Sequence, residues 1–295
     1  MNVVETSHLG RRYGSRWALQ ECSLEIPEGH LVALVGPNGS GKNTLLNLVV
    51  GLTAPSAGSV AVLGGARAGS VEALDRVAFV AQDVPLYKNL SVADMIRMTA
   101  SLNLHFDSKL ARRRLDAQGI EANQKAGSLS GGQQAQLALT LALARHPQLL
   151  VLDEPTASLD PLARHDFMAT VMTAMADDGV SVVLSSHMLA DLERVADYLV
   201  LLAGGRVRIS GPVDDLLAEH RVVTSAATDV LDANDCTVVE ASNAGGQTHR
   251  VIRLVNPDEW EAPSNSMVRG VGIEELSLAY LRQSHVSPVL AETGA

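Results

Sequence analysis

Short apolar runs alternate with longer stretches of helical periodicity along the first two hundred residues of the chain. The run at residues 149–152 is apolar at every position, which is typical of a strand buried on both faces of a parallel sheet. The alternation therefore predicts an α/β fold in which helices cover a mostly parallel sheet. The expected strands span residues 30–35, 77–80, 149–152, 180–184 and 198–202.

Two other segments have a different pattern. Between about residues 83 and 148 there is no strand candidate, and Ser91 begins a helical stretch with a capping-box pattern, so we expect an all-helical insert. After residue 220, weakly alternating runs are joined by polar, glycine-containing links, and Ile273, Leu276 and Tyr280 fall on one face of a short helix. The chain is therefore expected to hold one domain over residues 1–220 and a small α+β accessory domain over 221–295.

The composition narrows the class of protein. Of the 295 residues, 46% are hydrophobic, and the formal net charge of −10 argues against binding nucleic acid or anionic lipid by bulk attraction. The two cysteines, Cys22 and Cys236, have neither metal-ligand spacing nor the density of a disulfide framework. The N-terminus lacks the pattern of a secretion signal, and the apolar runs fall short of the ~20 residues that span a bilayer. We expect a cytoplasmic protein without a nucleic-acid partner, which reaches a membrane only through another protein.

A glycine-rich loop between a predicted strand and a predicted helix carries the strongest chemical signal. Backbone N–H groups of such a loop close around phosphate oxygens, the helix N-terminus adds its positive dipole end, and Lys42 supplies a cation to the β- and γ-phosphates. The alternative is a glycine-rich turn with a stray lysine, and the flanking strand and helix argue against it. This phosphate loop consists of Gly36, Pro37, Asn38, Gly39, Ser40, Gly41, Lys42, Asn43 and Thr44.

Position 43 departs from the usual pattern of such a loop. The residue after the lysine is normally Ser or Thr, whose hydroxyl binds Mg²⁺, and here it is Asn43. An amide oxygen is a suitable ligand for a hard cation, but the side chain is longer and Mg²⁺ requires near-ideal octahedral geometry. Thr44 is not expected to replace it, because one residue further along a helix points about 100° away. We therefore expect Asn43 to reduce turnover that depends on Mg²⁺.

Two further motifs fit phosphate chemistry. A predicted apolar strand ends in Asp153 and Glu154, at the sheet edge where ligands bind in such folds. Asp153 would hold Mg²⁺ and Glu154 would polarise the water that attacks the γ-phosphate; the alternative is an acid pair that caps a helix. Ser130, Gly131 and Gly132 predict a second helix start that can bind an anion, although such a triplet taken alone is more often a turn.

The order of the motifs resembles that of the nucleotide-binding subunits of ATP-binding-cassette transporters. Over about residues 1–220 the chain has, in family order, an aromatic residue for adenine stacking, the phosphate loop, the Q-loop glutamine, the family signature, a strand with two terminal acids, the D-loop aspartate and the switch histidine. These are Tyr13, residues 36–44, Gln82, residues 129–133, Asp153 with Glu154, Asp160 and His187. The resemblance implies a P-loop NTPase fold with a RecA-like core, and it implies ATP and Mg²⁺ as cofactors.

The resemblance also implies roles for individual residues. The catalytic group would be Lys42, Gln82, Glu154 and His187, and the metal ligands would be Asn43, Gln82 and Asp153. Two subunits would bind two ATP molecules head to tail, so that ATP on the phosphate loop of one chain is covered by the signature of the other. The covering residues would be Ser130, Gly131, Gly132 and Gln133, with Asp160 linking the two sites.

A single cassette without sustained heptads favours a transporter whose pore is a separate polypeptide. The helix expected near residue 273 is similar to the acidic-then-apolar terminal helix of bacterial drug and antibiotic exporter ATPases; the alternative is a generic amphipathic helix. We expect an ATPase that powers export of an unidentified substrate. Its partners would be an integral membrane permease, which holds it at the inner face of the membrane, and a second cassette, identical or different. Two alternatives stay open: a hydrolysis-impaired or regulatory cassette, suggested by Asn43, and a soluble ATPase without a role in transport.

Overall fold

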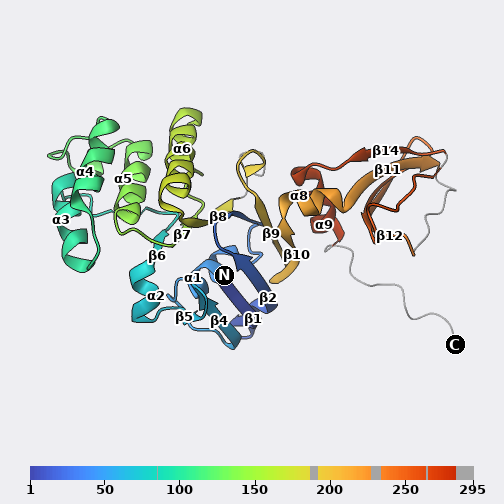
Figure 1. Ribbon diagram of the computed structural model, residues 1–295, viewed down its shortest axis with the longest axis horizontal. Helices are drawn as coiled ribbons and strands as arrows, with labels where there is room; N and C mark the ends of the chain where they lie inside the picture. Colours follow the sequence, from blue (N-terminus) through green and yellow to red (C-terminus); the bar gives the residue numbers. More distant parts are fainter. Residues whose placement is uncertain (85, 187–191, 227–233, 264, 284–295) are drawn as a thin grey trace.

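The centre of the structure is a six-stranded sheet in the order β10-β9-β3-β8-β7-β6 (Figure 1). Five strands of this sheet, from β9 to β6, are parallel, and β10 runs antiparallel along one edge. The five parallel strands match the five that the sequence predicts, which confirms the α/β fold. Their bounds, with that of β10, are β3 Leu31–Val35, β6 Val77–Val80, β7 Leu149–Asp153, β8 Ser181–Ser186, β9 Tyr198–Ala203 and β10 Arg206–Pro212. The computed structural model describes residues 1–84, 86–186, 192–226, 234–263 and 265–283.

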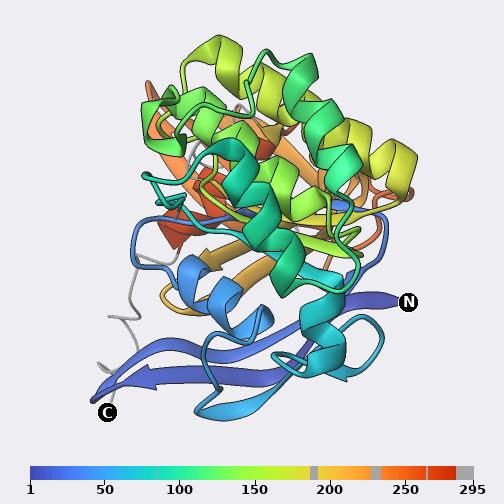
Figure 2. The same ribbon diagram turned by 90° about the vertical axis from the view of Figure 1, so that its left-hand side faces the viewer.

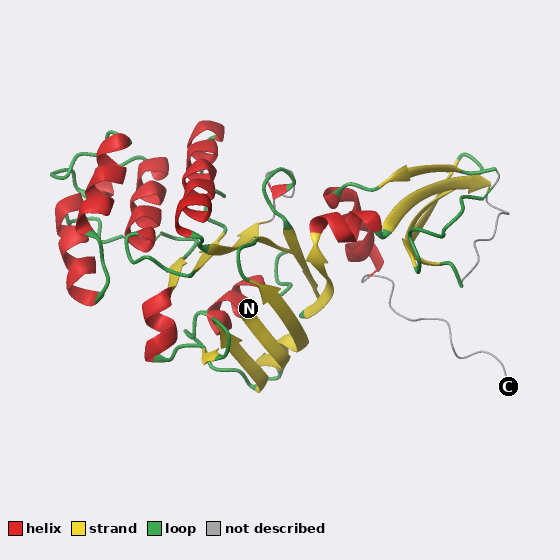
Figure 3. Cartoon of the chain, in the orientation of Figure 1, coloured by secondary structure: helices red, strands yellow, loops and turns green. Residues whose placement is uncertain are grey.

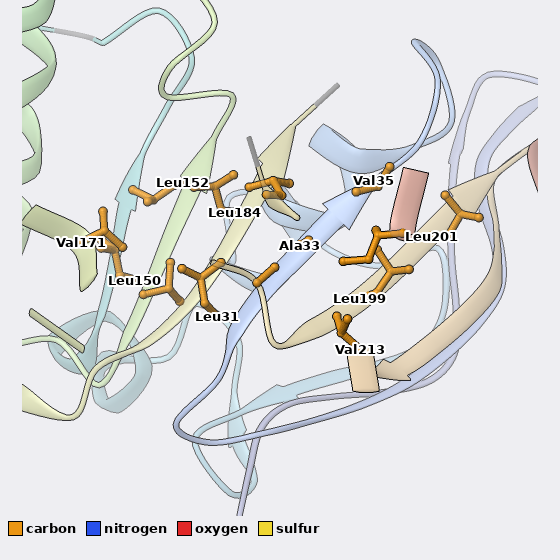
Figure 4. Close-up of a cluster of buried hydrophobic side chains, with 14 of the residues drawn as sticks. Leu31, Ala33, Val35, Leu150, Leu152, Val171, Leu184, Leu199, Leu201 and Val213 are labelled. Carbon is orange, nitrogen blue, oxygen red and sulfur yellow. The ribbon is translucent and has the colours of Figure 1, made fainter. Parts of the chain in front are cut away.

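Both faces of this sheet are covered, which explains the continuous apolar runs. Along β3, Leu31, Ala33 and Val35 belong to one buried cluster together with residues of α5 (Gly131–Leu143) and α6 (Pro161–Asp178) (Figure 4). Val32 and Leu34 belong instead to a cluster on the other face, with residues of α1 (Lys42–Val49). Because successive side chains of a strand point to opposite faces, a strand between two cores must be apolar at every position.

A second, antiparallel sheet in the order β2-β1-β4-β5 lies outside the sequence expectations. Its register explains why: the pairing of β1 with β2 shifts four times, and His8 and Glu21 have positive φ angles of 45° and 52°. Such bulges interrupt the alternation by which a half-buried strand is predicted. Leu46 of α1, on the face toward this second sheet, is fully buried. The strands are β1 Asn2–Tyr13, β2 Arg16–Pro27, β4 Ala57–Val62 and β5 Ala66–Arg67.

The segment between β6 and β7 forms a helical arm at one end of the central sheet (Figure 1), the end that faces the viewer in Figure 2. Two of its helices begin with complete capping boxes, Ser91 with Asp94 and Ser130 with Gln133, as the sequence pattern predicts at Ser91. The arm has its own buried cluster, which includes Leu137 of α5. Besides α5, its helices are α3 Val92–Leu102, α4 Ser108–Ala117 and the short 3₁₀ helix Ala126–Ser128; α2 (Val71–Arg76) precedes β6.

The C-terminal part lies on the side of the central sheet away from the helical arm (Figure 3). Its four strands pair in the order β12-β13-β11-β14, and the last helix packs back toward the centre, with Ile273 and Leu276 in the same buried cluster as Leu199 of β9. The domain boundary near residue 220 stays a prediction; β11 begins at that residue. The elements are α8 Val213–Ala218, β11 His220–Ala226, β12 Cys236–Ala244, β13 Gln247–Leu254, β14 Met267–Gly270 and α9 Ile273–Gln283.

None of the helices in the described part of the chain has the length and the apolar character needed to cross a membrane.

Candidate functional site

A hollow of about 920 Å³ lies where the tip of the β1–β2 hairpin meets the phosphate loop. We call it the nucleotide hollow. It is lined by segments that are far apart in the sequence: the hairpin tip, the phosphate loop, the ends of β6 and β7, and the turn between β9 and β10. The lining residues are Tyr13, Arg16, Trp17, Ala18, Asn38, Gly39, Gly41, Lys42, Asn43, Thr44, Gln82, Glu154, Gly204 and Gly205.

The phosphate loop is held tightly against β2 and around its own lysine. Gly41 has a φ of 107°, and a Cβ at this position would lie 2.7 Å from the carbonyl oxygen of Ala18, so only glycine fits there. The Lys42 Nζ donates to the carbonyl oxygens of Gly36 at 2.7 Å and of Pro37 at 3.4 Å. The Ser40 Oγ is buried and has no hydrogen-bond partner among the described residues. Polar groups are thus concentrated where phosphate oxygens would lie.

Burial and charge act in opposite directions on Lys42. Its side chain is only 4% exposed, and this burial lowers its pKa, while the nearby carboxylates of Glu154 and Asp153 raise it. A lysine in this setting gains from any further negative charge, because desolvation penalises its charged form. The position therefore favours an anionic ligand such as a phosphate group.

The two acids at the end of β7 are organised by a serine of the neighbouring strand. The Ser185 Oγ donates to the Asp153 Oδ1 at 2.7 Å and accepts a hydrogen bond from the Glu154 backbone N–H at 2.9 Å. Burial raises the pKa of Asp153, and the bond from Ser185 lowers it. Glu154 has a φ of 44°, in the left-handed region that costs about 1–2 kcal/mol for a non-glycine residue. Strain of this kind is characteristic of functional positions.

The two acids, Asp153 and Glu154, differ in their solvent exposure. Glu154 lines the nucleotide hollow, whereas Asp153 is only 6% exposed and is not one of the residues that line it. Both acids are identifiable from the sequence, whereas Ser185 is not. The sequence signal for Ser185 is a polar residue at the end of the predicted strand over residues 180–184. Parallel strands end at the same edge of a sheet, so such a residue can lie near the two acids.

The donors in the hollow suit a hard cation such as Mg²⁺. Asn43, Thr44 and Gln82 carry side-chain oxygens and line the hollow beside Glu154, and hard cations prefer oxygen ligands. Within the described part of the chain, no group of three or more His, Cys, Asp or Glu side chains could hold a metal by itself. The side-chain oxygens of Asn43, Thr44 and Gln82 fit a cation that shares its coordination with phosphate oxygens and water.

The hairpin tip supplies the aromatic side chains of the hollow. Tyr13 is 49% exposed, and the Arg11 Cζ lies 4.9 Å from the centre of its ring. Trp17 and Arg16 line the hollow as well, and neither was identified from the sequence. Aromatic residues make up only 3% of the chain, so a tryptophan four residues after Tyr13 could have been singled out as a candidate site residue.

The predicted signature and D-loop residues do not line this hollow. Ser130 and Gln133 form the capping box of α5, and Asp160 caps α6 by accepting from the backbone N–H groups of Leu162 and Ala163. Gly132 packs closely on α6, because a Cβ there would lie 2.8 Å from the Cβ of Ala163. His187 lies outside the described residues.

Comparison with known proteins relates the chain to one family. Residues 19–157 match the family described as ABC transporter. The Nod factor export ATP-binding protein I of Rhizobium etli is 32% identical over 270 residues, covering 87% of this chain and 78% of the relative. The lantibiotic transport ATP-binding protein SrtF of Streptococcus pyogenes is 29% identical over 219 residues, covering 72% of this chain and 92% of the relative.

Solved structures give the same relationship. The ATP-binding subunit of an ABC transporter superimposes with a TM-score of 0.65 at 28% identity, covering 72% of this chain and 91% of the other. A dimeric bacterial ABC transporter cassette gives a TM-score of 0.63 at 27% identity, covering 71% and 98%. The chain therefore belongs to the ABC transporter family, as an ATP-binding subunit with the P-loop NTPase fold.

Proposed function

We propose that this subunit binds and hydrolyses ATP with Mg²⁺ in the nucleotide hollow, and that hydrolysis powers export of a substrate through a separate membrane permease. The observation that carries the proposal is the hollow itself. It brings Lys42, Gln82 and Glu154 to one place next to an aromatic hairpin, although they are spread over more than a hundred residues of sequence. A nucleoside triphosphate needs these groups: a phosphate cradle, a carboxylate near the γ-phosphate and an apolar surface for the base.

The residues of the hollow would have different roles in binding and hydrolysing ATP. Backbone N–H groups of the loop would bind the β- and γ-phosphates. The Lys42 Nζ would bind them too, and would exchange its present hydrogen bonds to loop carbonyl oxygens for bonds to phosphate oxygens. Glu154 would accept the proton of the attacking water, and Gln82 would orient that water. Mg²⁺, when bound, neutralises the charge that develops on the phosphates. The ligands we assign to it are Asn43, Gln82 and Asp153, the last acting through water because it is buried and does not line the hollow.

A second cassette would complete the site. Ser130 and Gly131 are exposed at the start of α5 and do not line the nucleotide hollow of their own chain. We propose that they cover the nucleotide of a second subunit bound head to tail, as their helix N-terminus suits an anionic ligand. Asp160, also exposed, would then lie at the contact between the two sites.

Export is favoured over import by the extent of the likeness. The sulfate/thiosulfate import ATP-binding protein CysA of Synechocystis is also 32% identical, but the alignment covers 75% of this chain and 63% of the relative. The alignment with the Nod factor exporter subunit covers 87% of the chain, so it extends beyond the proposed cassette at residues 1–220. The C-terminal part is thus included in the likeness to the Nod factor exporter subunit, which supports the proposal of export.

An apolar groove between the helical arm and the α1–α2 side of the central domain supports a permease as partner. It has a volume of about 450 Å³ and lies between the end of α1, α2 and the end of α3. Leu52, Leu74, Leu102 and Leu104 line it and are 51–90% exposed. Exposed apolar patches of this kind mark protein contacts. Phe79 of β6 also lines the groove, and β6 leads to Gln82, so a permease segment bound here would contact an element of the nucleotide hollow. We propose that this contact holds the subunit at the cytoplasmic face of the membrane.

Asn43 favours a second candidate function, a cassette that binds ATP but hydrolyses it slowly. The experiment is to purify the subunit with its permease and to compare the wild-type protein with Asn43→Ser at a series of Mg²⁺ concentrations. We expect both proteins to bind ATP and the serine variant to turn it over faster. Asn47→Ser is the matched control, because Asn47 lies on the same helix but not in the hollow. Equal turnover of wild type and Asn43→Ser would contradict the reduced-activity assignment, and absence of hydrolysis in both would contradict the ATPase.

A further inference from the structure

A buried histidine joins the last helix, α9, to α8. His220 begins β11 directly after α8, and it is fully buried. Its Nδ1 lies 2.6 Å from the carbonyl oxygen of Leu216 in α8, and its Nε2 lies 2.9 Å from the hydroxyl oxygen of Tyr280 in α9. The imidazole therefore links two helices that lie between the central sheet and the C-terminal strands (Figure 1).

These two contacts suit only the neutral form of the ring. A carbonyl oxygen accepts hydrogen bonds, so the His220 Nδ1 carries a proton and donates it to Leu216. The Nε2 of the neutral ring then accepts the hydroxyl proton of Tyr280. A second proton on Nε2 would face that hydroxyl proton. Within the described part of the chain the Tyr280 hydroxyl has no other hydrogen-bond partner to which it could turn.

The charged groups on the elements around His220 do not compensate an imidazolium. Glu219 already accepts from the Nε and Nη2 of Arg253, at 3.0 and 2.9 Å. The Arg221 Nη1 donates to backbone carbonyl oxygens, including that of Ala218 at 2.9 Å. Among the described residues, no carboxylate forms an ion pair with the ring. The charged groups are Glu219 and Arg221 beside His220, Asp214 and Asp215 on α8, Arg253 on β13, and Glu274, Glu275 and Arg282 on α9.

Protonation of His220 is therefore linked to the folded state. Burial lowers the pKa of His220, the hydrogen bond to Leu216 raises it, Arg253 and Arg221 lower it further, and Glu219 opposes them. A histidine with a lowered pKa in the folded state contributes stability that is fully present above its ordinary pKa of 6.5. This stability is lost as the pH falls below that value, because the opened state binds the proton more readily.

The packing of α9 defines what such an opening would separate. Leu276 of α9 belongs to one buried cluster with Val222 of β11, Val251 of β13 and Leu192, which follows β8. Movement of α9 away from this cluster would also break the hydrogen bond between Tyr280 and His220 and admit water to the ring. Local opening of a terminal helix costs less free energy than global unfolding.

We propose that His220 and Tyr280 form a pH-sensitive latch. The neutral imidazole holds α9 against α8 and β11, and protonation at Nε2 favours a state in which α9 has moved away from them. The latch is independent of the proposed function, since neither residue lines the nucleotide hollow.

The test is hydrogen–deuterium exchange of the full chain, measured by mass spectrometry at pH 7.5 and pH 5.5. Protection factors correct for the effect of pH on the intrinsic exchange rate. We expect the protection of the α9 amides to fall up to about tenfold between these pH values, the limit for one group with an ordinary pKa of 6.5. The amides of α5, which is remote from the latch, should change less than twofold and are the internal reference.

Three variants assign the effect to the latch. His220→Gln keeps a donor and an acceptor but does not titrate, so its α9 protection should change less than twofold with pH. Tyr280→Phe removes the hydroxyl and should lower α9 protection about fivefold at pH 7.5, the usual contribution of one hydrogen bond. His249→Gln is the matched control, because His249 is an exposed histidine of β13 that contacts Thr224. It should keep the response of the wild-type protein.

Four results would overturn the inference. One is equal protection of α9 at the two pH values in the wild-type protein. Another is an equal fall in His220→Gln, because a different group would then titrate. A fall in α5 as large as in α9 would show global unfolding in place of a local latch. Unchanged α9 protection in Tyr280→Phe would show that the hydroxyl does not hold the helix, and this result stands even if His220→Gln fails to fold. Circular dichroism spectra establish which variants are folded.

Discussion

The close approach of the phosphate loop to β2 can be tested with two alanine substitutions. Gly39 and Gly41 both have positive φ angles, 79° and 107°. A Cβ at Gly39 would have no atom within 4 Å, whereas one at Gly41 would lie 2.7 Å from the Ala18 carbonyl oxygen and 2.6 Å from the Leu19 Cδ2. Gly39→Ala therefore introduces backbone strain alone, and Gly41→Ala introduces strain and a collision with the Ala18 carbonyl oxygen and the Leu19 side chain.

The magnitudes follow from these contacts. Strain at a positive φ costs about 1 kcal/mol for alanine, and overpacking against atoms that cannot move adds about 1–3 kcal/mol. We expect Gly39→Ala to lower the free energy of unfolding by about 1 kcal/mol and Gly41→Ala to lower it by about 3 kcal/mol. Urea unfolding measures both free energies, and displacement of a fluorescent nucleotide measures the affinity of the loop for nucleotide. Gly41→Ala should also weaken nucleotide binding more than tenfold, since a shift of the loop misplaces its N–H groups.

The two variants together test whether the phosphate loop packs against β2 and binds phosphate. Equal destabilisation by Gly39→Ala and Gly41→Ala would refute the reasoning, because the contact with β2 would then contribute nothing. Nucleotide binding that is unchanged in a folded Gly41→Ala protein would refute the assignment of this loop as the phosphate site.

Three further predictions concern the buried groups. Ser185→Ala removes the hydrogen bond that lowers the pKa of Asp153, so the acid limb of the ATPase pH profile should move to higher pH; an unmoved limb would contradict this. Burial raises the pKa of Asp153, so the folded chain binds this proton more tightly than the unfolded chain and loses stability as pH rises through the raised pKa. Asp153→Asn avoids that loss, and urea unfolding should show it gaining stability relative to wild type from pH 4 to pH 7; a difference independent of pH would exclude the effect. Leu276→Ala, at a fully buried position of α9, should cost about 2–5 kcal/mol, against less than about 1 kcal/mol for Leu278→Ala, which is 39% exposed; similar losses would show that α9 is not packed on the core.

The predictable part of the fold is the part whose pattern is uninterrupted. Strands such as β7, buried on both faces, give continuous apolar runs, and Ser91 with Asp94 gives a capping box. The N-terminal sheet escaped prediction because its register shifts and the positive φ angles of His8 and Glu21 disturb the alternation along β1 and β2. Local propensity cannot reveal strands whose pairing is decided by the core beneath them.

The candidate site also has a part that the sequence predicts and a part that it does not. Lys42 and Glu154 belong to contiguous motifs, so the sequence alone identifies them, and the structure places both in the nucleotide hollow. Ser185 and Arg16 belong to no motif; they reach the site only because β8 lies beside β7 and because β2 pairs with β1. Contacts between strands depend on the topology of the sheet, which single-sequence patterns do not specify.

The central claim is that ATP is hydrolysed in the nucleotide hollow with Glu154 as the base. The most direct measurement compares ATP binding and ATP turnover of wild type and Glu154→Gln, with the permease present. Glutamine keeps the size of the side chain but cannot accept the proton, so we expect ATP to bind as in wild type and turnover to fall at least about a hundredfold. Turnover by Glu154→Gln at the wild-type rate would contradict the account.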